Sequence, residues 1–127
     1  DPEQRQWLEA LLHPAIAVLI DEALANAASP YAILESPLLL ETSQHTLVDR
    51  VLVVDVSEAT QVARAARRDS SDEAQIRAIM DAQISRHGRL GRADDIIDND
   101  GPLTALEPAV AALHQRYLAL AAQHAGQ

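Results

Sequence analysis

Residues 50–56 read RVLVVDV, a mostly β-branched stretch with a continuous apolar run at its centre. A strand with one face in water alternates apolar and polar residues, whereas a continuous run is typical of a strand buried on both faces in a parallel sheet. Directly after it, residues 57–69 read SEATQVARAARRD and predict a helix. Residues 94–98, DDIID, predict a second short strand. Strands that alternate with helices in this way indicate an α/β fold.

The N-terminal part predicts helices followed by a strand. Asp1-Pro2 is a favourable helix start, with Asp as N-cap and Pro at the first helical position. The helix should end or kink at His13-Pro14, because a residue before Pro avoids the helical region. Residues 16–27 carry a second amphipathic pattern. Residues 31–36 predict a strand that ends before Pro37, which cannot donate to a ladder.

Further helices are predicted between the strands and at the C-terminus. Ser70-Glu73 and Thr104-Glu107 have capping-box spacing and should each open a helix. Gly88 and Gly91 should bracket a loop. The helix that opens at Ser70-Glu73 would present one apolar face, which holds Ile76, Ile79, Met80 and Ile84.

The composition excludes several classes of protein. A net charge of −9 argues against a general nucleic-acid binder. The absence of Cys excludes disulfides and thiolate metal sites. The absence of Lys excludes a Walker A loop, G-x-x-x-x-G-K-[ST], within these residues. No apolar run reaches membrane-spanning length and no signal peptide is visible, so no membrane association and a cytoplasmic location are expected.

Positive charge is concentrated in one segment of this acidic chain. Residues 64–92 hold seven of the ten arginines and four acids, which makes the segment +3. A local basic segment of this kind suggests a small polyanion such as a nucleotide phosphate group. The alternative is a solvated helical face with intrahelical ion pairs.

Three stretches together resemble the dephospho-coenzyme A kinase family. They are WLEALLHPAI (7–16), RVLVVDVSEATQVARAARRD (50–69) and RADDIIDNDG (92–101), and SPYAILESPLLLE (29–41) fits the same family between them. The resemblance covers nearly the whole chain in the right order. The strand–helix–Arg-Arg-Asp unit followed by A-D-D-x-I-D-N is its most specific part.

The resemblance implies a P-loop kinase with an α/β, P-loop NTPase-like three-layer fold, a parallel sheet and a helical lid. Such an enzyme transfers the γ-phosphoryl group of ATP to the 3′-hydroxyl of dephospho-coenzyme A. Residues 1–30 would form a helical substrate-binding region, and residues 64–92 an Arg-rich lid. Residues 31–63 and 93–127 would form the C-terminal part of the nucleotide-kinase core.

The match covers only the later part of the family, so the chain is expected to be a C-terminal fragment. The P-loop strand and the likely general base would lie before residue 1, and the fragment alone would be inactive. Without the central P-loop strand, the strand at 31–36 would lose its neighbour towards the strand at 51–56. Exposed strand edges and apolar faces, and self-association through them, are therefore expected. The fragment should not be an autonomous native domain.

Four arginines are candidates for binding phosphate, because a planar guanidinium donates to two phosphate oxygens and stays protonated. Arg64 and Arg68 lie four residues apart on one helical face and match the family's lid arginines, which implies catalytic roles. Arg86 and Arg89 match arginines at the end of the lid. The alternative for Arg64 and Arg68 is a surface position with pairing to Asp69 or Glu73. Arg67 lies off that face and is expected to be solvated.

Other candidate residues follow from the same resemblance. Asp98-Asn99 follows the second strand and should border the adenine of ATP, although Asn99-Asp100-Gly101 also has the composition of a simple turn. His13 would lie near the substrate region, or be only a hydrogen-bonded residue at a helix junction. Leu38, Leu39 and Glu41 match P-L-L-x-E and would lie near the coenzyme A substrate, with a core position as the alternative for the leucines.

No protein metal site is expected. Asp94, Asp95 and Asp98 have no helper His at a useful spacing, and Asp94 and Asp95 should point to opposite faces of the strand. Mg²⁺ would arrive with ATP and be held largely by phosphates and water. Two other functions stay open at this point: a non-enzymatic α/β module that binds a nucleotide or partner, and another small-molecule or nucleoside monophosphate kinase.

Overall fold

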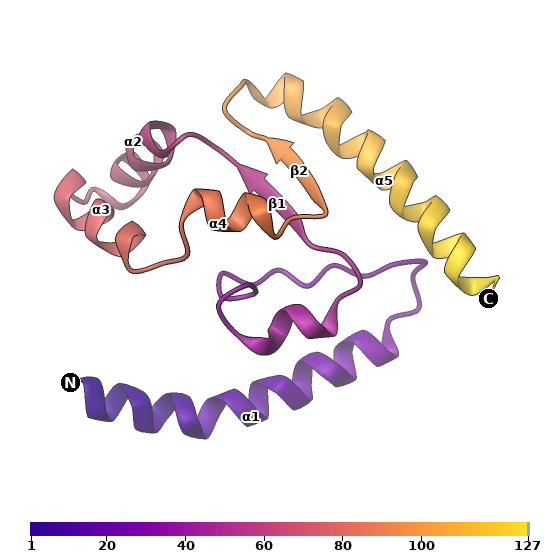
Figure 1. The fold of residues 1–127 in the computed structure, drawn as a ribbon, viewed down its shortest axis with the longest axis horizontal. Coiled ribbons are helices and arrows are strands. Elements are labelled where there is room, and N and C mark those ends of the chain that lie inside the picture. Colours follow the sequence, from indigo (N-terminus) through magenta and orange to yellow (C-terminus); the bar gives the residue numbers. More distant parts are fainter. Residues whose placement is uncertain (127) are drawn as a thin grey trace. The chain divides into compact units, whose positions relative to one another are not determined.

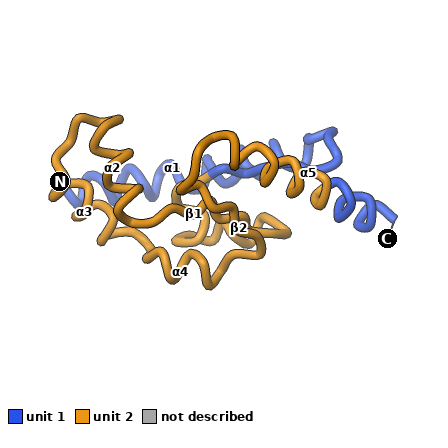
Figure 2. Tube along the Cα trace, turned by 90° about the horizontal axis from the view of Figure 1, so that it is seen from above, with its two compact units in different colours: residues 1–35, 118–127 blue, residues 36–117 orange. Residues whose placement is uncertain are grey.

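The computed structural model describes residues 1–126 and divides into two compact units (Figure 1, Figure 2). One unit comprises Asp1–Glu35 and Leu118–Gln127, and the other comprises Ser36–Tyr117. The second unit contains the sheet and every candidate site residue except His13. Its elements are η1 (Ser43–Leu47), β1 (Leu52–Asp55), α2 (Glu58–Asp69), α3 (Glu73–Asp81), α4 (Arg86–Gly91), β2 (Asp95–Asp98) and the first part of α5 (Leu103–Ala125).

The two strands β1 and β2 pair in parallel, which confirms both predicted strands and the α/β fold. Leu52 is aligned with Asp95, and Asp55 with Asp98. Backbone hydrogen bonds extend the pairing beyond the strands, because the Asn99 N–H donates to the Asp55 carbonyl at 2.8 Å. The carboxyl ends of both strands therefore lie at the same edge of the sheet.

Helices lie on both faces of this sheet. Side chains alternate along a strand, so Val53 and Asp55 share one face of β1, and Arg86 of α4 pairs with Asp55 there. Asp95 and Ile97 share a face of β2, and aligned residues of parallel strands project to the same side, which places these two on the opposite face. Tyr117 of α5 bonds to Asp95 there.

Each face is covered only in part. Val53 and Ile97 are buried, whereas Val54 is 56% exposed and Ile96 is 52% exposed. The prediction that the 50–56 strand is buried on both faces is therefore wrong in this structure. The prediction of an exposed apolar surface at the sheet is confirmed.

An ion-pair network anchors α5 to β2. Arg50 Nε and Nη2 donate to the two oxygens of the buried Asp95 carboxylate at 3.0 and 3.1 Å. The Tyr117 hydroxyl donates to Asp95 Oδ2 at 2.8 Å, and Arg116 Nη1 lies 3.6 Å from Oδ1. The Arg50 hydrogen bonds lower the pKa of Asp95, and burial, with the hydrogen bond to Asp95, raises the pKa of Tyr117 to about 12.

Helices α2 and α3 pack against each other through the buried Val62 and Ile76. The helix predicted over residues 57–69 is α2, and Ser57 caps it by accepting from the Thr60 N–H. The predicted capping box at Ser70 is wrong. Ser70 has φ 52° and ends α2 in the left-handed region, while Asp72 caps α3 by accepting from the Gln75 N–H. The predicted apolar face is also incomplete, because Ile79 is exposed.

The predicted loop at Gly88 and Gly91 is a short helix. Ser85 caps α4, and its hydroxyl oxygen accepts from the Gly88 N–H at 3.0 Å. A Cβ at Gly88 would lie 3.1 Å from Cγ1 of Ile84, so glycine here permits close packing rather than a turn. The predicted cap of the last helix is wrong as well: α5 begins at Leu103, one residue before Thr104.

Helix α1 (Pro2–Asn26) lies in the other unit and starts as predicted, with the Asp1 carboxylate accepting from the Glu3 N–H at 3.0 Å. The helix does not end at His13-Pro14 but continues through Pro14. The hydrogen bond that Pro14 cannot donate would have gone to the carbonyl of Ala10. Ala10 is an exposed residue, so the missing bond lies on a stretch of the helix that is in contact with water.

The strand predicted at residues 31–36 is absent, which is a correction to the sequence interpretation. A strand needs a neighbour to satisfy its backbone groups, and no described residue forms a ladder with this segment. Its side chain Ile33 is 76% exposed. Among residues 1–126, no helix combines the length and apolar character that crossing a bilayer requires. A cytoplasmic location stays a prediction of the sequence.

Candidate functional site

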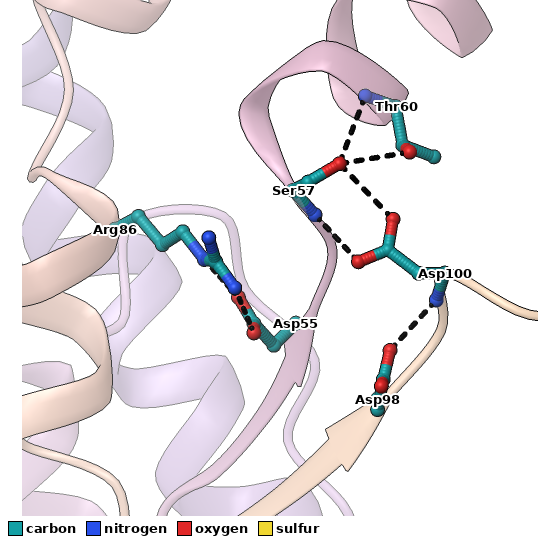
Figure 3. A network of polar contacts seen from close by, with 6 residues as sticks. All are labelled: Asp55, Ser57, Thr60, Arg86, Asp98 and Asp100. Carbon is teal, nitrogen blue, oxygen red and sulfur yellow. Dashed lines mark hydrogen bonds and ion pairs between the residues drawn. The ribbon is translucent and has the colours of Figure 1, made fainter.

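Polar side chains gather beyond the carboxyl ends of β1 and β2, where ligands of open α/β sheets bind (Figure 3). Asp55 ends β1, and Ser57 caps α2 two residues later. Asp98 ends β2, and Asp100 follows it in the turn. The parallel pairing brings these two junctions together, because both strands end at the same edge.

Asp100 links the turn after β2 to the start of α2. Its Oδ2 accepts from the Ser57 N–H at 2.9 Å, and its Oδ1 accepts from the Ser57 hydroxyl at 3.2 Å. The Ser57 hydroxyl oxygen in turn accepts from the Thr60 N–H at 3.2 Å. Hydrogen bonds from the Thr60 side chain and the Ser57 backbone lower the pKa of Asp100. The turn and the helix start are therefore held in one arrangement.

Asp55 and Arg86 form a bidentate ion pair between β1 and α4 (Figure 3). Nε and Nη2 of Arg86 donate to the two carboxylate oxygens at 2.9 and 2.8 Å. The side chains are 13% exposed for Asp55 and 39% exposed for Arg86. The hydrogen bonds from Arg86 lower the pKa of Asp55, and those bonds raise the pKa of Arg86. Both groups are therefore charged at neutral pH.

A cavity of about 270 Å³ lies between α2, α3 and α4. Its charged lining is Arg77, Arg86, Arg89, Glu58 and Asp81, and Arg77 pairs with Glu73 at 3.0 Å. Arg86 reaches from this cavity to Asp55, whereas Nη1 of Arg89 donates to the neutral Ile84 carbonyl at 2.8 Å. A phosphate group is the kind of anion that suits these guanidinium groups.

The structure brings two of the four predicted arginines together. Arg86 and Arg89 both line the cavity, whereas Arg64 and Arg68 do not. Arg68 pairs with its neighbour Asp69 at 2.8 and 2.9 Å, and its side chain is 77% exposed. This is the surface pairing that the sequence left open as the alternative. Arg64 is exposed on α2.

The turn after β2 has the local geometry of a simple turn, which does not exclude a second role. Asp98 Oδ1 accepts from the Asp100 N–H at 2.9 Å, and Asn99 uses its own N–H to extend the ladder. Both interpretations of Asp98-Asn99 therefore stay open.

The predicted substrate residues lie in two different units. His13 is exposed on α1. Glu41 Oε1 accepts from the Ile84 N–H at 3.0 Å and so contacts the segment before α4. Leu39 is half-buried, but Leu38 is exposed in a turn, so a core position for Leu38 is wrong.

Sequence reasoning missed Asp55, Asp100 and Arg77. The signal for Asp55 was its position at the carboxyl end of the RVLVVDV run, where a parallel strand presents residues to a ligand. Its partner Arg86 could not be read from local spacing, because 31 residues separate them. In the described part of the chain, no three His, Asp or Glu side chains gather in a way that could hold a metal ion. The guanidinium groups of Arg86 and Arg89 are the groups at the site that suit a polyanion such as the phosphates of ATP.

Comparisons with known proteins point to one family. The family model for dephospho-CoA kinase matches residues 1–105, which include every candidate residue. The chain is 53% identical over 122 residues to the dephospho-CoA kinase of Vibrio vulnificus strain CMCP6, covering 96% of this chain and 60% of that protein. It is 50% identical over 119 residues to the dephospho-CoA kinase of Idiomarina loihiensis, covering 94% of this chain and 59% of that protein.

A solved structure agrees with this fold. The crystal structure of TT1252 from Thermus thermophilus matches with a TM-score of 0.78 and 30% identity, over 91% of this chain and 61% of that one. The chain thus spans about 60% of the length of the curated relatives it matches. The match over residues 1–105 and these identities show that the chain belongs to the dephospho-CoA kinase family.

Proposed function

We propose that the whole protein that carries this sequence transfers the γ-phosphoryl group of ATP to the 3′-hydroxyl of dephospho-CoA. The products are CoA and ADP, and the reaction is the last step of coenzyme A synthesis. The observation that carries the proposal is 53% identity, over 96% of this chain, to a relative named dephospho-CoA kinase. The arginine-lined cavity beyond β1 supports it, because phosphoryl transfer depends on positioning and on charge neutralisation.

The proposal assigns distinct tasks to the residues. Arg86 and Arg89 bind phosphates of ATP, and Asp98-Asn99 borders the adenine. Arg64 and Arg68 are lid arginines that neutralise charge developing on the transferred group, which requires Arg68 to leave Asp69. Mg²⁺ accompanies ATP and is bound mainly by phosphate oxygens and water.

The acceptor would be held by a separate set of residues. His13 is assigned to the proposed helical substrate region of residues 1–30, and Leu38, Leu39 and Glu41 are assigned to acceptor binding separately, on their match to P-L-L-x-E. Residues 64–92 act as the lid in this proposal. The rest of the chain belongs to the nucleotide-kinase core.

The test is an acceptor comparison with the purified whole protein. ADP formation from MgATP is measured with dephospho-CoA, with AMP and without acceptor, and the product is identified by mass. ADP formation that depends on dephospho-CoA, with a product one phosphate heavier, is expected. Turnover with AMP alone would instead indicate a nucleoside monophosphate kinase. A folded protein that binds ATP but turns over with no acceptor would indicate a binding module.

Arg68→Ala tests the proposed lid role. It should lower kcat by more than tenfold, because a guanidinium that meets transition-state charge contributes more to the reaction than to ground-state binding. Arg67→Ala is the matched control, since Arg67 is an exposed arginine on the same helix. Equal kcat values for the two variants would leave Arg68 as a solvated surface residue paired with Asp69.

A further inference from the structure

The pair between Asp55 and Arg86 leaves part of the arginine free for a ligand. Its side-on contact engages Nε and Nη2 of the guanidinium. A guanidinium carries five N–H groups, and two of them are used in this contact. The donors on Nη1 and the second donor on Nη2 are not used by Asp55. Arg86 lines the cavity while it makes this contact.

Asp55 is itself held rigidly. It is the last residue of β1, aligned with Asp98 of β2. The carbonyl of Asp55 accepts from the Asn99 N–H at 2.8 Å, and its side chain is only 13% exposed. Arg86, by contrast, lies on a six-residue helix and has a long side chain with several rotatable bonds. A fixed carboxylate that pairs with such a side chain removes rotamer freedom before a ligand binds.

We infer that Asp55 is a positioning residue, which holds Arg86 so that its free N–H groups face a phosphate group of the nucleotide. The inference rests on the proposed function, since it assigns ATP as the anion. Asp55 does not touch the nucleotide and acts through Arg86. Arg89 Nη1 donates to the neutral Ile84 carbonyl, so Arg89 contributes a guanidinium to the cavity whose charge Asp55 does not offset.

A competing role for the same pair predicts the opposite change in ATP binding. If Asp55 only competed with phosphate for Arg86, removing its charge would improve ATP binding. If Asp55 positions Arg86, removing its charge weakens ATP binding, because the guanidinium loses its fixed orientation. Kinetic measurements on one variant therefore separate the two roles.

Asp55→Asn in the whole protein should raise KM for ATP about tenfold, the usual effect of losing a hydrogen bond to a charged group. KM for dephospho-CoA should stay within twofold of the wild-type value. Asp49→Asn is the matched control, since it removes the same charge from an exposed residue, and its KM for ATP should not change. An unchanged or lowered KM for ATP in Asp55→Asn would overturn the positioning role.

A double-mutant cycle tests whether Asp55 acts through Arg86. In an Arg86→Ala background, Asp55→Asn should cause no further rise in KM for ATP. A further tenfold rise would overturn the inference, because Asp55 would then act on its own. If Asp55→Asn is not folded at the assay temperature, as judged by circular dichroism, Asp55→Glu takes its place. It keeps the carboxylate but displaces the pair, and it should also raise KM for ATP; a wild-type KM would overturn the inference.

The same variants distinguish failure of the inference from failure of the proposed function. If the wild-type protein shows no turnover with dephospho-CoA, the kinase proposal fails, and ATP affinity is measured by titration calorimetry. Wild-type binding of ATP that weakens in Asp55→Asn would still support the positioning role. Binding that is equal in both proteins, or absent in the wild type, would overturn it.

Discussion

Replacing Arg86 by alanine in the whole protein is expected to lower kcat/KM for ATP about a hundredfold. Two effects add in this variant. The phosphate loses a positioned guanidinium, and the Asp55 carboxylate, now without its partner, is left at the carboxyl end of β1 beside a phosphate site. Like charges at such a distance repel each other. The measurement is initial-rate kinetics with ATP varied at saturating dephospho-CoA.

Arg67→Ala is the control for this prediction, because it removes an exposed arginine of the Arg-rich segment that does not line the cavity. Its kcat/KM should stay within twofold of the wild-type value. Adding Asp55→Asn to Arg86→Ala should recover part of the loss, since it removes the unpaired carboxylate. A kcat/KM of Arg86→Ala that matches that of Arg67→Ala would exclude Arg86 from the phosphate site.

Asp95→Asn is expected to lower the free energy of unfolding by about 2 to 3 kcal/mol. The Asp95 side chain is 3% exposed and holds Arg50, Tyr117 and Arg116. Loss of the charge weakens every one of these contacts. The expected effect is at or below the lower end of the range for buried pairs, because the Arg50 side chain is 32% exposed and regains water. Urea unfolding of the whole protein measures it.

The pH dependence of this stability difference tests whether the Asp95 carboxylate causes it. The pKa of Asp95 is lowered in the folded state, first by the Arg50 hydrogen bonds, so its contribution is present above the unfolded value of about 3.9 and is lost as pH falls through the folded value. The stability gap between wild type and Asp95→Asn should therefore be largest near pH 6 and shrink towards pH 3. The free energy of unfolding of Asp49→Asn should match that of the wild type both near pH 6 and near pH 3. A gap that does not change with pH would assign the loss to packing.

Local patterns in the sequence were sufficient for the two strands of the sheet and for the helix that follows the first of them. The β-branched run RVLVVDV, the helical pattern of residues 57–69 and DDIID predict β1, α2 and β2 without knowledge of long-range contacts. Each signal is carried by adjacent residues, and the structure places each element where its signal lies. The concentration of arginines in residues 64–92 also predicted a basic site, and Arg86 and Arg89 line the cavity.

Features that depend on distant partners could not be predicted in the same way. The segment 31–36 has strand-forming residues, but a strand forms only where another pairs with it. The prediction of a loop at Gly88 and Gly91 was wrong, because glycine is common both in turns and at sites of close packing. Only the packing of Gly88 against Ile84 decides between the two. The Asp55–Arg86 pair of the site joins residues 31 positions apart. The Arg50–Asp95 pair of the network that anchors α5 joins residues 45 positions apart.

The most direct test of the site is a crystal structure of the whole protein with a nonhydrolysable ATP analogue and Mg²⁺. Phosphate oxygens should lie about 3 Å from Nη1 or Nη2 of Arg86 and from the guanidinium of Arg89. Arg86 should keep its side-on contact with Asp55 while it binds the phosphate. A nucleotide whose phosphates contact neither Arg86 nor Arg89 would contradict the proposed phosphate site beyond β1.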